Sequence, residues 1–545
     1  MKSGKLKGTI DPQTYFSRVE NPKIQRSVFD RSNGLKTSID AGTIYPVYVD
    51  EALPGDTFDL KAHIFGRIAT PIKPLMDNIY FDLHFFSCPN RLLWSNWVKF
   101  MGEQDDPGDS IAYTIPKIEP GVSSSFAEES LGDYMGVATK VNNLSVNALP
   151  FRMYNLVYNE WYRDQNLIDS VVVDLGDSAV DGSDYTLLKR GKRKDYFTGA
   201  LPWAQKGDAV TLPIGSSAPV LAYNDSDGTF PTDNTYFRYI QDGTILQPTS
   251  NTDVRTAAST GNVEATDSAT ARQAYYDPGS DTLYADLSSA TASTINAIRL
   301  AFQTQKLLER DARGGTRYIE LIKSRFGVMS PDFRQQRPEY LGGCTSHISM
   351  TPIAQTSATD TGASSQTVQG NLSAIGTVQV NGKGFTKSFT EHETILGLVS
   401  VRADLTYQQG NDKMWLRDTR YDYYWPAFAH LGEQAILNEE IYAQGSAADD
   451  NAFGYQERYA EYRYKPSKIT GVYRSNHSSS LDVWHLAQDF ASLPSLNQSF
   501  VEETPPMSRV VAVTSEPEFL LDCYFDLKCT RPLPVFATPG KIDHF

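Results

Sequence analysis

Apolar and polar residues alternate at several places along the chain, and this period of two predicts β-strands. The segments that show it are residues 44–49, 58–68, 79–86, 394–407 and 519–527. Most are separated by long connections rich in proline rather than by tight two-residue turns. Strands joined in this way favour a β-sandwich with crossing loops over a simple meander.

A second spacing, with apolar residues every three or four positions, predicts helices. It occurs in residues 91–101, 149–167 and 297–308, and a further short helix is expected over residues 318–325. The stripe of the segment 297–308 consists of Ala297, Leu300, Ala301, Thr304, Leu307 and Leu308. The chain is therefore expected to be mainly β with several short to medium helices.

Two long tracts lack either spacing and are rich in small polar residues. The first, residues 205–290, predicts an outward-facing insertion between a first part of the core (1–204, with an N-terminal arm) and a last part (291–545). Between Lys206 and Asp286 it holds eleven acidic and four basic residues, in a chain whose net charge is −15. The second tract, residues 355–384, is interpreted as a long loop.

Basic residues concentrate on either side of the acidic tract. Residues 299–337 contain nine basic and four acidic side chains, and residues 189–194 contain five basic side chains. Such segments either pair with acidic neighbours or contact a polyanion. For the segment 189–194, a phosphate-binding loop and a solvated loop remain equally good interpretations.

Aromatic and basic residues also interleave in residues 453–475. This pattern is compatible with stacking on unpaired bases of single-stranded nucleic acid, but we favour ordinary packing and interfaces. The candidates for facing nucleic acid are Lys189, Arg190, Lys192, Arg193, Lys194, Arg310, Arg313, Arg317, Arg458, Arg463 and Lys465.

The sequence gives little indication of catalysis or metal binding. His392 and Glu393 begin like a zinc-protease motif, but position 396 is leucine, so the second histidine is missing. The four cysteines fit neither a zinc motif nor a disulfide framework. No membrane span is expected, since no run of about eighteen apolar residues occurs. We therefore expect neither an enzyme nor a cofactor.

Long motifs in a fixed order resemble the major capsid proteins of the microviruses, small phages with circular single-stranded DNA, and fit the gokushovirus branch best. The segments that carry the resemblance are FDRSNGLKTSIDAG, YVDEALPGDTF, LPFRMYNLVYNEWYRDQNL, KRGKRKDYFTGALPWAQKG, RLAFQTQKLLERDARGGTRYIELIKSRFGV, GYQERYAEYRYKPSKITG and FATPGKIDHF. The resemblance extends over essentially the entire chain apart from residues 208–290 and the polar tract near residue 360.

The resemblance implies an eight-stranded antiparallel viral jelly roll with long inserted loops. It implies self-assembly into a small T=1 icosahedral shell around circular single-stranded DNA, within the virion, after assembly in the bacterial host cytoplasm. The implied partners are an internal scaffolding protein, a DNA pilot protein, a small basic DNA-condensing protein and a host surface receptor.

In that branch a long insertion forms a protrusion near the threefold axes and engages the host, and the acidic insertion fits this place. The receptor-binding candidates within it are Tyr223, Asp225, Asp227, Tyr236, Phe237 and Tyr239. The alternative hypothesis is a free glycan-binding jelly-roll phage protein of the lectin or fibre type. A hydrolase on the same fold would lack an assembled set of catalytic residues.

Overall fold

A computed structural model describes residues 25–120, 125–178, 180–208, 210, 295–313, 335–358 and 367–536, together with six short strands between residues 220 and 285. The chain divides into two compact units. The larger unit consists of Met1–Ala204 and Gly314–Phe545, and the smaller unit of Gln205–Arg313. The second unit thus begins where the insertion was predicted to begin, and it also takes in the basic helix that follows.

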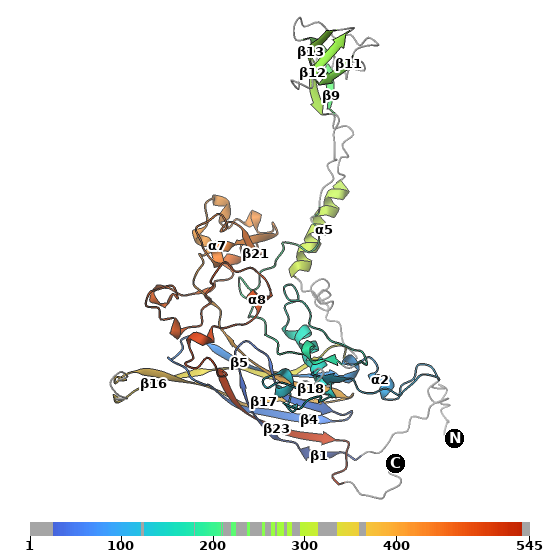
Figure 1. Ribbon diagram of the computed structural model, residues 1–545, viewed down its shortest axis with the longest axis vertical. Helices are drawn as coiled ribbons and strands as arrows, with labels where there is room; N and C mark the ends of the chain where they lie inside the picture. The colour runs from blue at the N-terminus through green and yellow to red at the C-terminus, as the bar shows by residue number, and fades with distance from the viewer. Residues whose placement is uncertain are drawn as a thin grey trace, which may run out of the picture. The chain divides into compact units, whose positions relative to one another are not determined.

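The larger unit is built on two antiparallel sheets (Figure 1). The first sheet contains β1 (Ser27–Asp30), β2 (Asn33–Ile39), β23 (Phe519–Arg531), β4 (Thr57–Ile68), β17 (Leu372–Ser388) and β16 (Ser349–Ala354). The second sheet contains, in spatial order, β15 (Glu339–His347), β5 (Ile79–Pro89), β18 (Glu393–Ala403) and β3 (Tyr45–Ala52).

From β2 onward the chain passes repeatedly between the two sheets. In the first sheet β23 lies between β2 and β4, and β4 pairs with β17 on its other side. In the second sheet β5 and β18 are central, flanked by β15 and β3. This order is that of a jelly roll, so the predicted antiparallel sandwich is confirmed, and β1 and β16 extend the first sheet at its edges.

The core lies between the sheets, where Phe85 of β5 meets Phe525 of β23 with ring centroids 6.5 Å apart. The period of two is clear in β4, because Leu60 and Ile64 are buried in this core while Lys61 and Phe65 are exposed on the other side. The outer face of the first sheet is therefore uncovered in the described part of the chain.

The second sheet is buried on both sides. Phe86, Leu396 and Leu398 point away from the sandwich core and join a second apolar cluster. That cluster is built around α4 (Leu149–Val157), whose Tyr154 is fully buried and donates a hydrogen bond from its hydroxyl to Ile44 O (2.8 Å). Loops and short helices thus cover this sheet and leave the other bare.

The helix predictions hold only in part. The segment 91–101 contains a short 3₁₀ turn (Asn90–Leu92) and α2 (Trp97–Phe100) instead of one helix. After α4 the chain makes a π-helical turn, Tyr158–Tyr162, and becomes extended at Arg163. The expected helix over residues 318–325 lies outside the described residues.

The prediction of a long loop over residues 355–384 is wrong for the last thirteen residues of that tract. Residues from 372 onward belong to β17, which pairs with both β4 and β16. Ala374, Val378 and Val380 face the core and the polar residues between them face solvent, so a strand with small polar outward residues was mistaken for a loop.

The smaller unit contains strands where no clear periodicity was found. Its four-stranded sheet is formed by β10 (Phe237–Tyr239), β13 (Thr270–Tyr276), β12 (Val263–Asp267) and β11 (Asp253–Thr256), and β9 (Val220–Asn224) pairs with β14 (Asp281–Ala285). The helix α5 (Ile295–Arg313) carries the predicted apolar stripe, but Leu300 and Leu307 are 68% and 49% exposed. Lys206 N donates to Leu308 O (3.4 Å), so the two ends of the unit lie together.

A buried charge cluster joins the covering loops to the second sheet. Asp82 of β5, 2% exposed, accepts hydrogen bonds from Arg190, Arg402 (Nε, 2.9 Å) and Thr345. Burial alone would raise the pKa of Asp82, but these three partners hold it below its ordinary value. Because Arg190 comes from the loop after residue 188, this single carboxylate ties that loop to the sheet.

We expect the substitution Asp82→Ala to lower the free energy of unfolding of the unassembled chain by about 3–5 kcal/mol, because it leaves two nearly buried arginines without a counter-charge. Denaturant titration followed by tryptophan fluorescence measures this. The matched control is Asp522→Ala, which breaks an exposed pair with Lys36 and should cost less than about 1 kcal/mol. Equal losses in the two variants would contradict this role.

A partly buried carboxylate, that of Glu518, makes stability depend on pH. Burial raises the pKa of Glu518 from 4.5 to about 7, Asp40 adds to the rise, and the hydrogen bond from Ala41 N (2.8 Å) opposes it. A carboxyl with a raised folded-state pKa stabilises the fold at low pH, and this contribution is lost as pH rises from about 4.5 through 7.

We therefore expect the unassembled protein to melt a few degrees higher at pH 6 than at pH 8, and the substitution Glu518→Gln to remove most of this difference. Thermal melting across that range provides the measurement. A variant that keeps the full pH dependence of the parent would show that another group is responsible.

Candidate functional surfaces

The basic loop 189–194 is anchored in its first half, and its side chains alternate between inward and outward directions. Isolated bridges join Lys189 to Thr43 and Gly191 to Glu502. Arg190 points inward to Asp82, and Lys192, only 8% exposed, donates to Phe500 O (2.7 Å) and lies 5.0 Å from the Phe500 ring centroid. Two of the five cations therefore hold the loop in place.

The remaining cations of this loop are on the surface. Lys189, Arg193 and Lys194 are exposed, and Lys194 also pairs with Asp164. Burial lowers the pKa of Lys192, with Glu503 acting in the opposite direction. The loop thus offers an exposed positive edge supported by two inward cations, an arrangement that the plain count of five bases did not reveal.

The basic candidates of the smaller unit are on α5. Arg310 and Arg313 are exposed in the last turn of this helix, where cations complement the negative end of the helix dipole. Arg317 lies outside the described residues. That these residues contact phosphates remains a prediction.

The receptor-binding candidates belong to two different sheets of the smaller unit. Tyr223 is on β9, opposite Thr282, whereas Phe237 and Tyr239 are on β10, opposite Tyr276 and Ala274. Asp225, Asp227 and Tyr236 lie outside the described residues. Their part in receptor binding stays a prediction.

The remaining basic candidates lie among aromatic rings of the larger unit. The Arg458 guanidinium is 6.0 Å from the Phe428 ring centroid and 5.0 Å from that of Tyr459, and Arg463 pairs with Glu457. Lys465 is exposed beside them. The interleaving of aromatic and basic residues in the sequence agrees with the position of these cations near aromatic rings. It did not indicate that a carboxylate pairs with Arg463.

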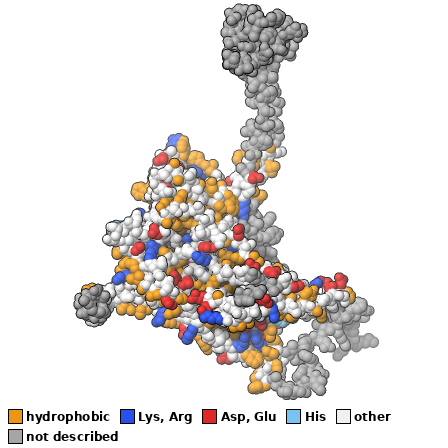
Figure 2. All heavy atoms as spheres, viewed as in Figure 1, with side chains coloured by type: hydrophobic (Ala, Val, Ile, Leu, Met, Phe, Trp, Pro, Cys, Tyr) orange, Lys and Arg blue, Asp and Glu red, His pale blue; other side chains and the backbone are white. Residues whose placement is uncertain are grey.

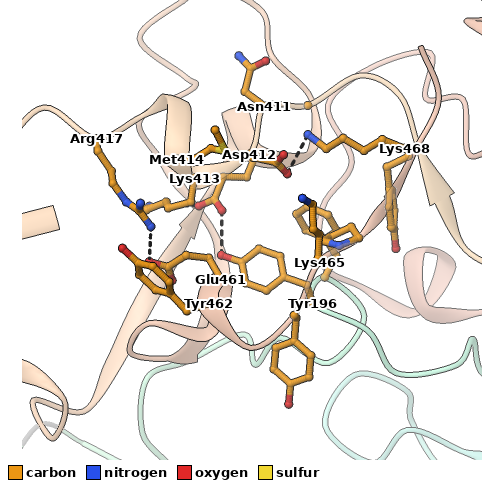
Figure 3. Close-up of a pocket in the computed structure, with 16 residues that line it drawn as sticks. Tyr196, Asn411, Asp412, Lys413, Met414, Arg417, Glu461, Tyr462, Lys465 and Lys468 are labelled. Carbon is orange, nitrogen blue, oxygen red and sulfur yellow. Dashed lines mark hydrogen bonds and ion pairs between the residues drawn. The ribbon is translucent and has the colours of Figure 1, made fainter. Parts of the chain in front are cut away.

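A cavity of about 240 Å³ opens in the same region (Figure 3). Its polar lining is paired internally: Lys413 and the Tyr196 hydroxyl donate to Glu440 (3.1 and 2.8 Å), and Lys468 pairs with Asp412 (2.9 Å). Burial and the Glu440 charge raise the pKa of Tyr196. A tyrosine held in this way is a structural hydrogen-bond donor rather than an acid–base catalyst.

The cavity lining comes from segments far apart in the sequence. They include Tyr196, the segment 410–417, Glu440 and the segment 461–468. Only the interleaving of tyrosine and lysine in residues 453–475 gave any signal of this site. The pairing of each cation with a distant acid depends on tertiary folding and leaves no local pattern.

The described residues hold no group of three or more His, Cys, Asp or Glu side chains suited to a metal ion. Within the same residues no helix is long and apolar enough to cross a bilayer. The four cysteines are free thiols, and burial raises the pKa of Cys523 to about 12. Such a thiol is poorly nucleophilic near neutral pH.

Comparison with known proteins places this architecture in a family. A family model described as capsid protein (F protein) matches residues 17–541. The chain is 47% identical to capsid protein VP1 of Bdellovibrio phage phiMH2K over 543 residues, with 99% of each chain covered. It is 42% identical to capsid protein VP1 of Chlamydia phage 1 and 34% identical to that of Spiroplasma virus 4, with 96% of this chain and 97% of each relative covered. The resemblance drawn from the sequence motifs is thereby confirmed, and the chain belongs to the phage capsid protein (F protein) family.

Proposed function

We propose that this capsid protein assembles into a small T=1 icosahedral shell that encloses a circular single-stranded DNA genome. The observation that carries the proposal is a capsid-family match over residues 17–541 on a chain folded as a jelly roll. Family membership places the chain in the virion and gives it a structural rather than an enzymatic part. A closed shell repeats the same heterologous contacts by symmetry, which needs a rigid subunit with several separate contact surfaces.

The charge distribution supports a division of labour with basic partners. A chain of net charge −15 cannot neutralise a packaged genome over its whole surface. We assign most of that neutralisation to a small basic DNA-condensing protein, and we assign assembly and delivery to an internal scaffolding protein and a DNA pilot protein. Assembly then takes place in the bacterial host cytoplasm, where these proteins are made together.

Local contact with the genome is proposed for the exposed edge of the basic loop. Lys189, Arg193 and Lys194 are exposed on a loop that the Asp82 cluster and Lys192 hold rigidly. Lysine and arginine in this setting contact phosphates without strong sequence preference. Arg190 and Lys192 act as positioning residues for that edge.

Electron microscopy combined with nuclease digestion of the protein from scaffold-co-expressing, infected cells tests these proposals. We expect isometric shells with protected circular DNA. The triple variant Lys189→Ala, Arg193→Ala, Lys194→Ala should still form shells but should release DNA at lower salt, because each lost phosphate contact reduces the salt slope by about 0.7 for single strands.

The control for this variant is Lys140→Ala, which removes an exposed cation paired with Glu128 in another loop. Unchanged DNA retention in the triple variant would show that the basic loop does not contact the genome. Discrete trimers or monomers of the parent protein that bind glycans would contradict the proposal of a shell. They would favour a free lectin-like or fibre-like protein.

We further propose that the smaller unit forms a protrusion at the threefold axes and attaches the particle to a host surface receptor. The exposed Leu300 and Leu307 on α5 support it, because an amphipathic helix that leaves leucines in solvent generally packs against another chain. The acidic composition of the segment suits an outward, solvated surface.

Deleting residues 207–307 should leave shell assembly intact and abolish adsorption to host cells. A linker of two glycines suffices, because Lys206 N and Leu308 O are 3.4 Å apart. Particle yield by gradient sedimentation and binding to host cells measure the two effects. Loss of shells in the deletion variant would show that the unit is part of the shell, and unchanged adsorption would place receptor binding elsewhere.

A further inference from the structure

The larger unit exposes an unusual concentration of large aromatic and apolar side chains in one region. Nine of them, each 49–72% exposed, come from residues 414–431 and 462–464. They are Met414, Trp415, Tyr421, Tyr423, Tyr424, Trp425, Leu431, Tyr462 and Tyr464. We call this set the aromatic surface. In Figure 2, orange side chains reach the surface over the part of the unit that carries α7 (Asn438–Ile441) and β21 (Ala452–Glu457) in Figure 1.

Ring contacts and a shared arginine join three members of this set, Tyr423, Tyr424 and Tyr462, into one continuous surface. Tyr424 lies 6.3 Å from Tyr462 and 5.1 Å from the buried Tyr459 between ring centroids. The Arg417 guanidinium lies over both Tyr423 (5.1 Å) and Tyr462 (4.6 Å). Met414 and Tyr464 line the same cavity as Tyr462, which extends the surface to the cavity mouth.

The rings are also held in fixed positions although they face solvent. The Trp425 indole N–H donates to Arg420 O (2.7 Å), and Arg420 lies 4.7 Å from the Tyr421 ring centroid. Arg417 is itself fixed by Glu461 (3.4 Å). Side chains ordered before binding lose little conformational entropy in a contact, which is characteristic of a binding surface rather than of incidental exposure.

The size of the surface matches a subunit contact. Nine large side chains, about half exposed, leave on the order of 1,000 Å² accessible. Isolated apolar patches on monomeric proteins are usually about 300–600 Å², whereas a stable interface takes about 800 Å² from each partner. Tryptophan, tyrosine, methionine and arginine, which make up most of this surface, are also the residues enriched at interface centres.

The charges around the surface argue against nucleic acid as its occupant. Residues 409–474 contain eight basic and ten acidic residues. Lys413, Arg417, Arg463 and Lys468 are each paired with a carboxylate of the same region. A polyanion would gain little binding free energy from cations that are already neutralised. A protein surface of mixed charge does not depend on unpaired cations in this way.

We infer that the aromatic surface is a contact surface for a second copy of this chain within the shell. The inference rests on the proposed assembly and specifies one of the heterologous contacts that it requires. Trp415 and Tyr423 are the most exposed tryptophan and tyrosine of the set, so we expect them to lose much accessible surface in the contact. Arg417 positions Tyr423 and Tyr462 for the contact.

The test compares the double variant Trp415→Ser, Tyr423→Ser with the parent protein, both co-expressed with their scaffold. Neither substitution changes a buried core residue, so the unassembled chain should melt as the parent does. We expect association weaker by about tenfold or more per contact, and hence few or no shells by sedimentation and electron microscopy. The matched control is Tyr524→Ser, a similarly exposed tyrosine on the uncovered sheet.

Oxidative footprinting of the parent protein identifies the occupant. Trp415 and Tyr423 should be modified in unassembled chains and protected in empty shells and DNA-filled particles alike. Protection only in DNA-filled particles would assign the surface to DNA and overturn the inference. So would normal shell yield from the double variant, or an equal loss of shells in the Tyr524→Ser control. A parent protein that forms no shells would instead refute the proposed assembly itself.

Discussion

The whole sandwich depends on the pairing of the last strand with the first ones. β23 lies between β2 and β4, and its fully buried Cys523 is opposite Leu35 on one side and Ile64 on the other. The first sheet is incomplete until residues almost 490 positions apart in the sequence have met. Such non-local pairing carries a high loop-closure entropy and makes folding slow, but it fixes both ends of the chain in one sheet.

This constraint explains where the chain can carry its functional surfaces. With the sandwich closed by its terminal strands, the connections between inner strands are free to lengthen, since the entropy of closing a loop rises only slowly with its length. The longest of them contains the smaller unit, and others cover the second sheet. The Asp82 cluster then fixes the basic loop on that sheet, and Arg417 and Trp425 fix the aromatic surface on another loop. In the shell that we propose, these rigid loops on a closed sandwich would form the separate contact surfaces.

Much of the scaffold could be predicted from local sequence patterns. The strands β3, β4, β5, β18 and β23 were predicted because apolar residues recur at every second position on one or both of their faces. β17 was missed because most of its outward residues are polar or glycine, such as Ser373, Gln379 and Gly382, and these are also typical of loops. The helical spacing of Trp94 and Trp97 predicts one helix over residues 91–101, although both rings simply fill one apolar cluster.

The surfaces were less predictable, because their character depends on which charges become paired. The count of five bases in residues 189–194 did not show that Arg190 and Lys192 turn inward. The tyrosines and cations of residues 453–475 suggested nucleic acid or an interface. Within that segment Arg463 pairs with Glu457 and Lys468 with Asp412, and these pairs support the inference of an interface. Asp412 lies far from Lys468 in the sequence, so this pair leaves no local pattern.

The mass of the assembled particle, measured on single particles purified from infected cells, tests the proposed shell most sharply. A T=1 shell contains sixty copies of the 60.6 kDa chain, so we expect about 3.6 MDa of this protein together with one circular DNA molecule. A population limited to monomers or trimers in the presence of the scaffold would contradict it.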